Sequence, residues 1–244
     1  MSERVALITG GARGIGHAIA LNLVEEGWSV AISYRKSKKE AEETVAAIKS
    51  KGSRGIAEQA DVSDPQAAEK LVRKIEKECG RVDALINCVG PYHRVNLMEE
   101  TVEGWHSMFN NNLHPVFYLS RIVASGMKAR KWGRIVNFSM ANADQMIAQP
   151  ELTAHYISKV GVLILTRSLA RLLAPHGITV NAVSPGFINS GSAPEEELAS
   201  MVKRIPAGYV GETRDAVGVV RFLLSEEARY VNGANVHLSG AWGI

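Results

Sequence analysis

Val5-Ala6-Leu7-Ile8-Thr9-Gly10-Gly11-Ala12-Arg13-Gly14-Ile15-Gly16 is the stretch that decides the fold. Its first five residues are apolar or β-branched, which is typical of a strand covered on both faces. Apolar residues then recur at helical spacing until Gly27, which ends the predicted helix. Glycines between a strand and a helix let the backbone approach a pyrophosphate, and the helix N-terminus offers oriented N–H groups. The stretch therefore predicts a dinucleotide-binding turn rather than an ordinary tight turn.

The same alternation of strands and helices continues to the C-terminus. Further strands are expected at 29–33, 55–60, 82–87, 134–138, 179–183 and 235–238, and further helices at about 37–51, 65–79, 101–130, 152–174 and 214–224. Such βαβ units give parallel strands with right-handed crossovers. We therefore predict an α/β fold, a Rossmann-type doubly wound seven-stranded parallel sheet with helices on both faces. Residues 1–244 form one dinucleotide-binding domain, and residues from about 189 to 207 form a substrate flap.

Composition limits the classes of protein that this chain can belong to. Its 244 residues carry 28 basic and 25 acidic side chains, and a net charge of +3 does not indicate nucleic acid as a partner. Two cysteines are too few for a disulfide scaffold, and the histidines form no ligand-spaced cluster, so no metal is expected. No signal peptide is evident, and no apolar run reaches the ~18–20 residues that span a bilayer. We therefore expect a soluble cytoplasmic protein without a membrane partner.

Several motifs resemble those of one family. Gly10-x-x-x-Gly14-Ile15-Gly16 resembles the glycine motif of the short-chain dehydrogenase/reductase family, and the resemblance covers essentially the whole chain. Asp61-Val62 resembles the acidic pair beside the adenine ring, and Asn87-Cys88-Val89-Gly90 resembles an Asn-Asn-Ala-Gly element with two positions changed. Pro185-Gly186-Phe187-Ile188 resembles the turn after strand six, and Ser190 replaces the usual Thr near the nicotinamide. The resemblance thus implies these cofactor-binding residues: Gly10, Gly14, Ile15, Gly16, Asp61, Val62, Asn87, Gly90, Pro185, Gly186, Ile188 and Ser190.

The end of the second predicted strand bears on the choice of nicotinamide cofactor. It reads Ser33-Tyr34-Arg35-Lys36-Ser37-Lys38-Lys39, with no acidic residue before Glu40. An NAD site usually carries an acid there for the ribose hydroxyl, whereas NADP requires cations. Arg13 lies close to the same pocket in this family, and a guanidinium offers phosphate a rigid fork of donors. The sequence therefore favours NADPH, with Arg13, Tyr34 and Arg35 in its pocket, over a merely solvated basic face.

A polar residue interrupts the apolar face of the predicted helix at 101–130. Asn112 falls on that face by i,i+3 and i,i+4 spacing, and a buried amide needs hydrogen-bond partners. Pro115 removes the donor that would reach the carbonyl of Asn111, so we expect a kink. Asn112 either ties down this kink or, as the resemblance implies, is the active-site Asn that helps to hold a Lys and a water in a proton relay.

The family's central motif is displaced here. In Tyr-x-x-x-Lys the Tyr protonates a carbonyl as hydride arrives, and the adjacent ammonium lowers the Tyr pKa from about 10 toward neutrality. This chain reads His155-Tyr156-Ile157-Ser158-Lys159, so the residue four positions before Lys159 is His155. Residues 145–153 read like a short insertion before this helix. Ser139 ends the fifth strand at the sheet edge where ligands bind.

Three interpretations of the displaced motif are open. Tyr156 reaches the site if the first helical turn is bulged or tightened. His155 is the acid, although the nearby cation of Lys159 disfavours the imidazolium. The third interpretation is a weakly active or silent site. Under all three, Lys159 keeps its second family role of binding the nicotinamide ribose.

Together these residues predict an NADPH-dependent oxidoreductase that reduces a carbonyl held by Ser139. The whole-chain pattern is most similar to bacterial 3-oxoacyl-[acyl-carrier-protein] reductases, which implies a 3-oxoacyl thioester as a candidate substrate. The alternatives are a catalytically weak or silent NADPH-binding subunit, and an enoyl or pterin reductase of the same family. The helix at 152–174 is apolar nearly all round, so we also expect a homotetramer or homodimer.

Overall fold

The computed structural model describes residues 4–191 and 195–244, and its centre is one parallel sheet. The strands are β1 (Val5–Thr9), β2 (Ser29–Tyr34), β3 (Gly55–Gln59), β4 (Ala84–Asn87), β5 (Gly133–Phe138), β6 (Ile178–Pro185) and β9 (Asn235–Leu238). They lie in the order β3-β2-β1-β4-β5-β6-β9, which confirms the Rossmann-type doubly wound fold. β1 pairs with β2 on one side and β4 on the other, so the winding reverses between β1 and β4. Open α/β sheets bind ligands at the carboxyl side of this point.

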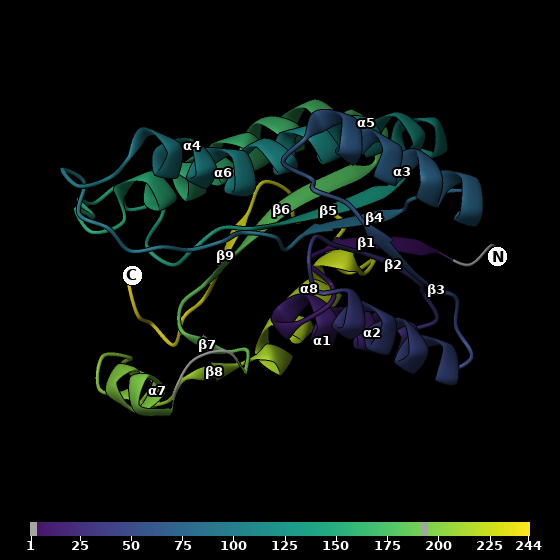
Figure 1. Ribbon diagram of the computed structural model, residues 1–244. Coiled ribbons are helices and arrows are strands. Elements are labelled where there is room, and N and C mark those ends of the chain that lie inside the picture. Colours follow the sequence, from purple (N-terminus) through teal and green to yellow (C-terminus); the bar gives the residue numbers. More distant parts are fainter. Residues whose placement is uncertain (1–3, 192–194) are drawn as a thin grey trace.

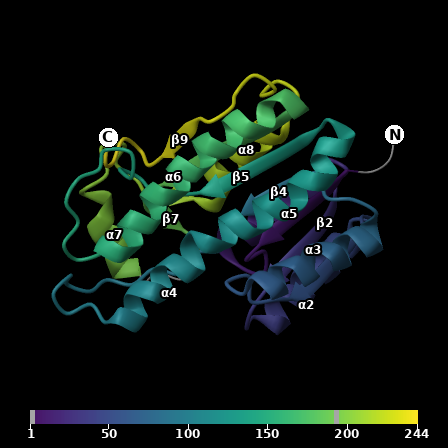
Figure 2. The same ribbon diagram turned by 90° about the horizontal axis from the view of Figure 1, so that it is seen from above.

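Helices cover both faces of the sheet. They are α1 (Gly14–Glu25), α2 (Lys38–Ser50), α3 (Pro65–Cys79), α4 (Val102–Asn112), α5 (His114–Arg130), α6 (Thr153–Leu173) and α8 (Thr213–Leu224), with a short 3-10 turn η1 (Ala174–His176) after α6. Figure 1 shows α3, α4, α5 and α6 on one face and α1, α2 and α8 on the other. Seen from above, α4 and α5 follow one another almost in line, with α6 alongside (Figure 2).

Burial on both faces explains why the first strand is apolar throughout. Ile8 packs in the layer of α1 and α8, together with Leu23 and Leu223. Leu7, the preceding residue, packs in the opposite layer with Leu71 of α3. Successive side chains of a strand point to opposite faces, so each layer needs its own apolar set. The sheet therefore separates two cores, and the polar residues that serve a site gather at its carboxyl edge.

The segment expected as one helix at 101–130 is two helices. α4 ends at Asn112, and α5 begins at His114. Pro115 lies in the first turn of α5, where a missing N–H breaks no helical hydrogen bond. The expected kink is therefore a complete break, which corrects the prediction of a continuous helix. The other predicted elements of the sheet and its covering helices end within two residues of the observed bounds.

A small unit stands apart from the seven-stranded sheet, in the segment expected to form a flap. β7 (Ile188–Asn189) pairs in parallel with β8 (Gly211–Glu212), and α7 (Glu195–Val202) lies between them along the chain. Figure 1 shows the three elements together, near the N-terminal end of α8. Residues 192–194 of the predicted flap lie outside the described residues.

In the described part of the chain, every helix is too short or too polar to cross a membrane.

Candidate active site

A cavity of about 630 Å³ opens at the carboxyl ends of β1, β2 and β4. Eleven of the residues that the sequence assigns to the cofactor line it: Gly10, Arg13, Gly14, Ile15, Gly16, Tyr34, Arg35, Asp61, Val62, Gly90 and Ser190. The cavity thus brings together five segments that are distant in the sequence. It lies at the point where the winding of the sheet reverses.

The glycine turn brings bare backbone to this cavity. A Cβ on Gly16 would lie 2.6 Å from the carbonyl oxygen of Gly10, so only glycine fits there. Gly10 and Gly14 have φ values of +67° and +56°, a backbone region that glycine adopts most readily. Arg13 is the N-cap of α1, but its side chain makes no capping hydrogen bond, and the first turn contains no acidic residue. The N–H groups of this helix end are therefore available to an anion.

Three cations surround the part of the cavity beyond β2. Arg35 donates to Oδ1 of Asn111 over 3.0 Å and lies 3.6 Å from Oδ2 of Asp61. Arg13 and Lys36 also line the cavity and, among the described residues, neither pairs with a carboxylate. Lys36 and Asn111 were not singled out in the sequence, although each adjoins a residue that was. This end of the cavity carries a net positive charge.

Lys159 lies buried at the other end of the cavity. Its ammonium donates to the carbonyl of Phe138 over 3.0 Å, and burial lowers its pKa to about 8. A Cβ on Gly90 would lie 2.8 Å from Nζ of Lys159 and 2.7 Å from Oδ1 of Asn112. Gly90 lines the cavity, so a cation and an amide oxygen both lie directly behind its wall. This juxtaposition brings together three of the predicted site residues.

Asn112 is buried and uses only half of its hydrogen-bonding capacity. Its Nδ2 donates to the carbonyls of Met108, over 2.9 Å, and Pro91, over 3.1 Å. Its Oδ1 is buried and has no hydrogen-bond partner. Buried amide oxygens normally accept a hydrogen bond. Asn112 therefore fixes the segment that follows β4 and also offers an acceptor beside Lys159.

His155 occupies the position one helical turn before Lys159. Its ring meets Tyr92 edge-on, with 5.3 Å between the ring centroids. The ring lies beside the backbone of Pro91, and its Nδ1 is buried without a hydrogen-bond partner. Burial, and then the charge of Lys159, lower the pKa of His155 to about 3. The imidazole is therefore neutral at physiological pH.

Tyr156 points away from Lys159. Its hydroxyl donates to the carbonyl of Asn142 over 2.7 Å and accepts from the N–H of Ile147 over 3.1 Å. The backbone N–H of Tyr156 bonds to Leu152 at 2.9 Å, so the first turn of α6 has ordinary helical spacing. The bulge that would turn Tyr156 toward Lys159 is absent from this helix, which corrects that interpretation. Tyr156 instead holds the inserted segment.

The remaining predicted residues lie at the margins of the site. The Ser139 hydroxyl donates to the carbonyl of Lys159 over 2.8 Å and is buried. Its hydrogen is engaged with α6, and the expectation that Ser139 holds a substrate carbonyl stays a prediction. Asn87 bonds to Asn137 over 2.8 Å and keeps a buried Oδ1 without a partner. Asn87, Lys159, Pro185, Gly186 and Ile188 do not line the cavity itself.

The arrangement of the chain and its cavity is shared with known proteins. A family model described as Enoyl-(Acyl carrier protein) reductase matches residues 10–241. The chain is a short-chain dehydrogenase/reductase. It is therefore an oxidoreductase of a family that uses a nicotinamide cofactor. The resemblance identified in the glycine motif is confirmed over nearly the full length.

Two curated relatives carry the same name. The chain is 37% identical to the 3-oxoacyl-[acyl-carrier-protein] reductase FabG of Staphylococcus aureus over 238 residues, which are 96% of each chain. It is 35% identical to the enzyme of that name from Vibrio harveyi over 248 residues, covering 98% of this chain and 97% of the relative.

Two solved structures share the fold closely. One, described as a short-chain alcohol dehydrogenase from Sinorhizobium meliloti, is 31% identical with a TM-score of 0.92 and covers 99% of this chain and 97% of its own. The other, described as a gluconate dehydrogenase from Agrobacterium tumefaciens, is 28% identical with a TM-score of 0.90 and covers 97% and 94%. Each of these four matches covers at least 94% of both chains. The family's architecture therefore extends over nearly the whole of this chain.

The residues of the cavity fit a nicotinamide dinucleotide. Gly10, Gly14 and Gly16 leave room where a side chain would meet neighbouring atoms. The uncapped N-terminus of α1 suits a pyrophosphate, and the cations beyond β2 suit further phosphate. Two buried amide oxygens without partners, on Asn87 and Asn112, lie on segments that border the same cavity. The donors and the space are both of the kind that such a cofactor requires.

Proposed function

We propose that this short-chain dehydrogenase/reductase is an NADPH-dependent carbonyl reductase. One observation carries the proposal: a single cavity runs from a cluster of cations after β2 to Gly90, behind which the ammonium of Lys159 and Oδ1 of Asn112 both lie. The first end suits the phosphates of the cofactor, and the second supplies a buried proton-bearing group. We further propose a cytoplasmic location, like that expected from the sequence.

NADPH rather than NADH follows from the charges at the first end. Arg13, Arg35 and Lys36 line the cavity, and β2 ends at Tyr34 without an acidic side chain. Asp61 lies nearby, but its carboxylate faces Arg35 and accepts hydrogen bonds from Ser63. A 2′-phosphate has charge-assisted donors here, whereas a 2′-hydroxyl has no unengaged acid to accept its hydrogen bond.

Each residue has a defined task in this proposal. A bound reduced nicotinamide supplies hydride to a carbonyl carbon. The turn from Gly10 to Gly16 binds the pyrophosphate through its backbone, and Lys159 reaches the nicotinamide ribose. Asn112 holds the segment at Pro91 through its Nδ2 and orients a polar group beside Lys159 through its Oδ1. Ser139 ties β5 to α6 through the Lys159 carbonyl and thereby fixes the lysine backbone.

A 3-oxoacyl thioester is the substrate that we propose. Curated relatives that match nearly the whole chain are named as 3-oxoacyl-[acyl-carrier-protein] reductases. A second cavity of about 480 Å³ lies beside the start of α6 and is lined mainly by apolar side chains, including Leu97, Ile147, Ile157 and Val160. An apolar surface of this kind suits an acyl chain.

A silent NADPH-binding subunit is the second candidate. Three observations favour it: the hydroxyls of Ser139 and Tyr156 both donate to backbone carbonyls, and the ring of His155 is neutral because its pKa is lowered to about 3. Such a subunit binds the cofactor with the same preference but does not oxidise it.

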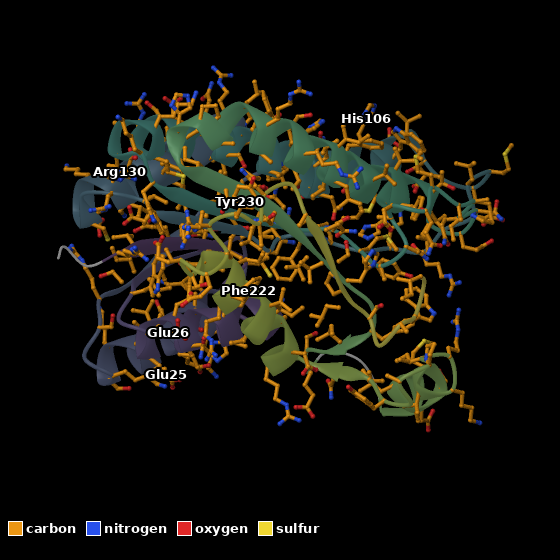
Figure 3. All side chains as sticks on the ribbon, turned by 180° about the vertical axis from the view of Figure 1, so that it is seen from behind. Glu25, Glu26, His106, Arg130, Phe222 and Tyr230 are labelled. Carbon is orange, nitrogen blue, oxygen red and sulfur yellow. The ribbon has the colours of Figure 1, made fainter. Side chains whose placement is uncertain are left out.

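The assembly that we propose is a homodimer or homotetramer. Four large apolar side chains of α5 and α6 are exposed to solvent: Phe117 at 44%, Ile157 at 41%, Ile164 at 59% and Leu172 at 68%. Two more, Phe222 at 47% and Tyr230 at 97%, are exposed on α8 and on the segment after it (Figure 3). A two-fold axis at each surface would bury both and give a tetramer. Light scattering tests this, and a monomer of 26.4 kDa at micromolar concentration contradicts it.

The deciding experiment combines binding and turnover. Fluorescence titration with NADPH and NADH measures affinity, and absorbance at saturating NADPH measures oxidation with 3-oxoacyl, simple ketone, enoyl and pterin substrates. We expect tighter binding of NADPH and turnover of the 3-oxoacyl thioester. Turnover only of enoyl or pterin substrates assigns the chain to those reductases. Binding without any oxidation supports the silent subunit.

A further inference from the structure

We propose that the ammonium group of Lys159 is itself the proton donor in this reductase, and that His155 is a neutral positioning residue that holds the Gly90–Pro91 segment beside it. The inference rests on the proposed carbonyl reduction and names the group that completes it. It follows from the hydrogen bonds that the polar side chains at the catalytic end of the cavity make.

The other side chains of the site have already committed their acidic hydrogens. The hydroxyl of Ser139 donates to the carbonyl of Lys159, and that of Tyr156 donates to the carbonyl of Asn142. The ring of His155 is neutral, because burial and the charge of Lys159 lower its pKa to about 3. Burial raises the pKa of the Cys88 thiol to about 12, which makes it a poor acid near neutrality.

Lys159 is different because, within the described residues, not all of its N–H donors have an acceptor. An ammonium carries three donors, and within the described residues only Phe138 accepts one of them. The Nζ lies behind Gly90, where the missing side chain leaves the cation next to the cavity wall. Two donors are therefore available to a carbonyl oxygen on that side. The pKa of about 8 that burial gives this group also suits proton transfer near pH 7.

The groups that face Lys159 leave its charge uncompensated. Cys88 approaches from the end of β4 as a thiol, α4 presents only the neutral amide of Asn112, and α6 itself presents the neutral ring of His155. In the described part of the chain no carboxylate forms an ion pair with Lys159. Carboxylates usually raise the pKa of a buried lysine, and none opposes the effect of desolvation here.

His155 has a structural task that explains its place. The Nδ2 of Asn112 donates to the Pro91 carbonyl from α4, and the ring of His155 lies beside the Pro91 backbone from α6. Tyr92 packs edge-on against the same ring. The two side chains therefore hold Pro91 in place. This fixes the distance between Gly90, in the cavity wall, and the ammonium of Lys159.

The proton transfer balances without another reagent. As hydride adds to the carbonyl carbon, the π electrons of the C=O bond move to oxygen, which forms an O–H bond with a proton of Lys159. The N–H bonding pair stays on Nζ as the lone pair of a neutral amine. Water in the open cavity then returns a proton to this amine. In alcohol oxidation the neutral amine takes the proton instead.

The two directions of reaction should therefore respond oppositely to pH. The rate constant kcat for reduction should be level below pH 8 and fall about tenfold per pH unit above it, as the ammonium loses its proton. The rate constant for oxidation should rise over the same range. His155 contributes no inflection between pH 5 and pH 9, because its pKa lies near 3.

Amine rescue of a truncated lysine tests the donor directly. Lys159→Ala should lower kcat at saturating NADPH by about 10²–10⁴-fold. Added ethylamine should raise the kcat of this variant at least about tenfold. Lys159→Arg keeps the charge but cannot release a proton near neutrality, so it should stay inactive while NADPH binding persists. Lys128→Arg, on the exposed outer side of α5, is the matched control with unchanged kcat. Failure of every amine to restore turnover in a folded, NADPH-binding Lys159→Ala protein overturns the proposal.

Nitrogen NMR gives a readout that does not need turnover. The Nζ resonance, assigned by its loss in Lys159→Met, should titrate near pH 8, and the His155 ring should stay neutral from pH 5 to pH 9. A Lys159 midpoint near 10.5, or protonation of His155 between pH 5 and pH 8, overturns the proposal even if no substrate is found. Tyr92 is exposed, and its phenol ring meets that of His155 edge-on. If Tyr92→Phe lowers kcat as much as Lys159→Ala does, Tyr92 is the proton donor instead.

Discussion

The two ends of the cavity are built in different ways. The glycine end is made of consecutive residues between β1 and α1, and its shape follows from where side chains are missing. The lysine end is assembled from α4, α6 and the segments after β4 and β5, and its chemistry follows from which hydrogens are already bonded. A backbone turn depends on local residue type, whereas a proton donor depends on everything packed around it. The first end therefore follows from a short run of residues, while the second depends on contacts between several elements.

The largest effect should come from adding one methyl group at the glycine end. Gly16→Ala places a Cβ 2.6 Å from the Gly10 carbonyl oxygen, so the turn must open. We expect the Kd for NADPH to rise more than about 100-fold, which is about 2.7 kcal/mol. Fluorescence titration measures it.

Gly218→Ala is the matched control for that change. Gly218 lies on α8 with nothing within 4 Å of an added Cβ, so NADPH affinity should be unchanged and the protein slightly more stable, by about 0.5–1 kcal/mol. Equal affinity in Gly16→Ala and Gly218→Ala would show that the turn does not shape the cofactor site.

The next effect concerns the cations that surround the same end. Arg13→Ala and Arg35→Ala should each lower the preference for NADPH over NADH about tenfold, because each removes a charge-assisted contact to the 2′-phosphate. The two Kd values of each variant measure this ratio. Arg121→Ala, an exposed arginine of α5, should leave it unchanged. A preference that survives both cavity substitutions would mean that another group selects the cofactor.

Tyr156 sharpens the comparison at the lysine end. Tyr156→Phe removes a hydroxyl that bonds to Asn142 and Ile147, and should lower the free energy of unfolding by about 1–2 kcal/mol. Because this hydroxyl faces the inserted segment, kcat should change less than about threefold. Urea unfolding and steady-state kinetics measure the two quantities, with the exposed Tyr230→Phe as control. A hundredfold loss of kcat at unchanged stability would return the acid role to Tyr156.

The smallest effect belongs to an ion pair that ties the inserted segment to β9. Asp144 lies 2.9 Å from Nε2 of His237. Burial raises the pKa of Asp144, but the hydrogen bond and charge of His237 outweigh it and hold that pKa below its ordinary value. The pair therefore stabilises the fold above the ordinary carboxyl pKa, and this contribution fades as pH falls through the lowered value.

Asp144→Asn should remove that pH dependence. Because both partners are partly exposed, we expect a loss of no more than about 0.5–1 kcal/mol at pH 6 and a smaller loss at pH 3. Thermal unfolding at the two pH values compares the variant with the parent chain. An equal loss at both pH values would mean that packing, and not charge, joins the segment to β9.

Sequence by itself determined the sheet, the cofactor end and the presence of a lysine-centred site. Periodicity fixed the strands because each β1 residue must fill one of two cores, as Leu7 and Ile8 do. The glycine spacing fixed the turn because backbone geometry depends on the residues within it. The sequence also showed that His155 stands where the family motif has Tyr, since helical spacing places it one turn before Lys159.

Tertiary structure alone decided the roles at the lysine end. The pattern could not show that Tyr156 bonds to a segment fourteen residues earlier, or that Ser139 bonds to the backbone of Lys159. It also could not separate one long helix from α4 and α5, because Pro115 suits both a kink and a new first turn. Hydrogen bonds and desolvation are set by atoms from several elements at once, so the state of a proton at Lys159 or His155 exists only in the folded chain.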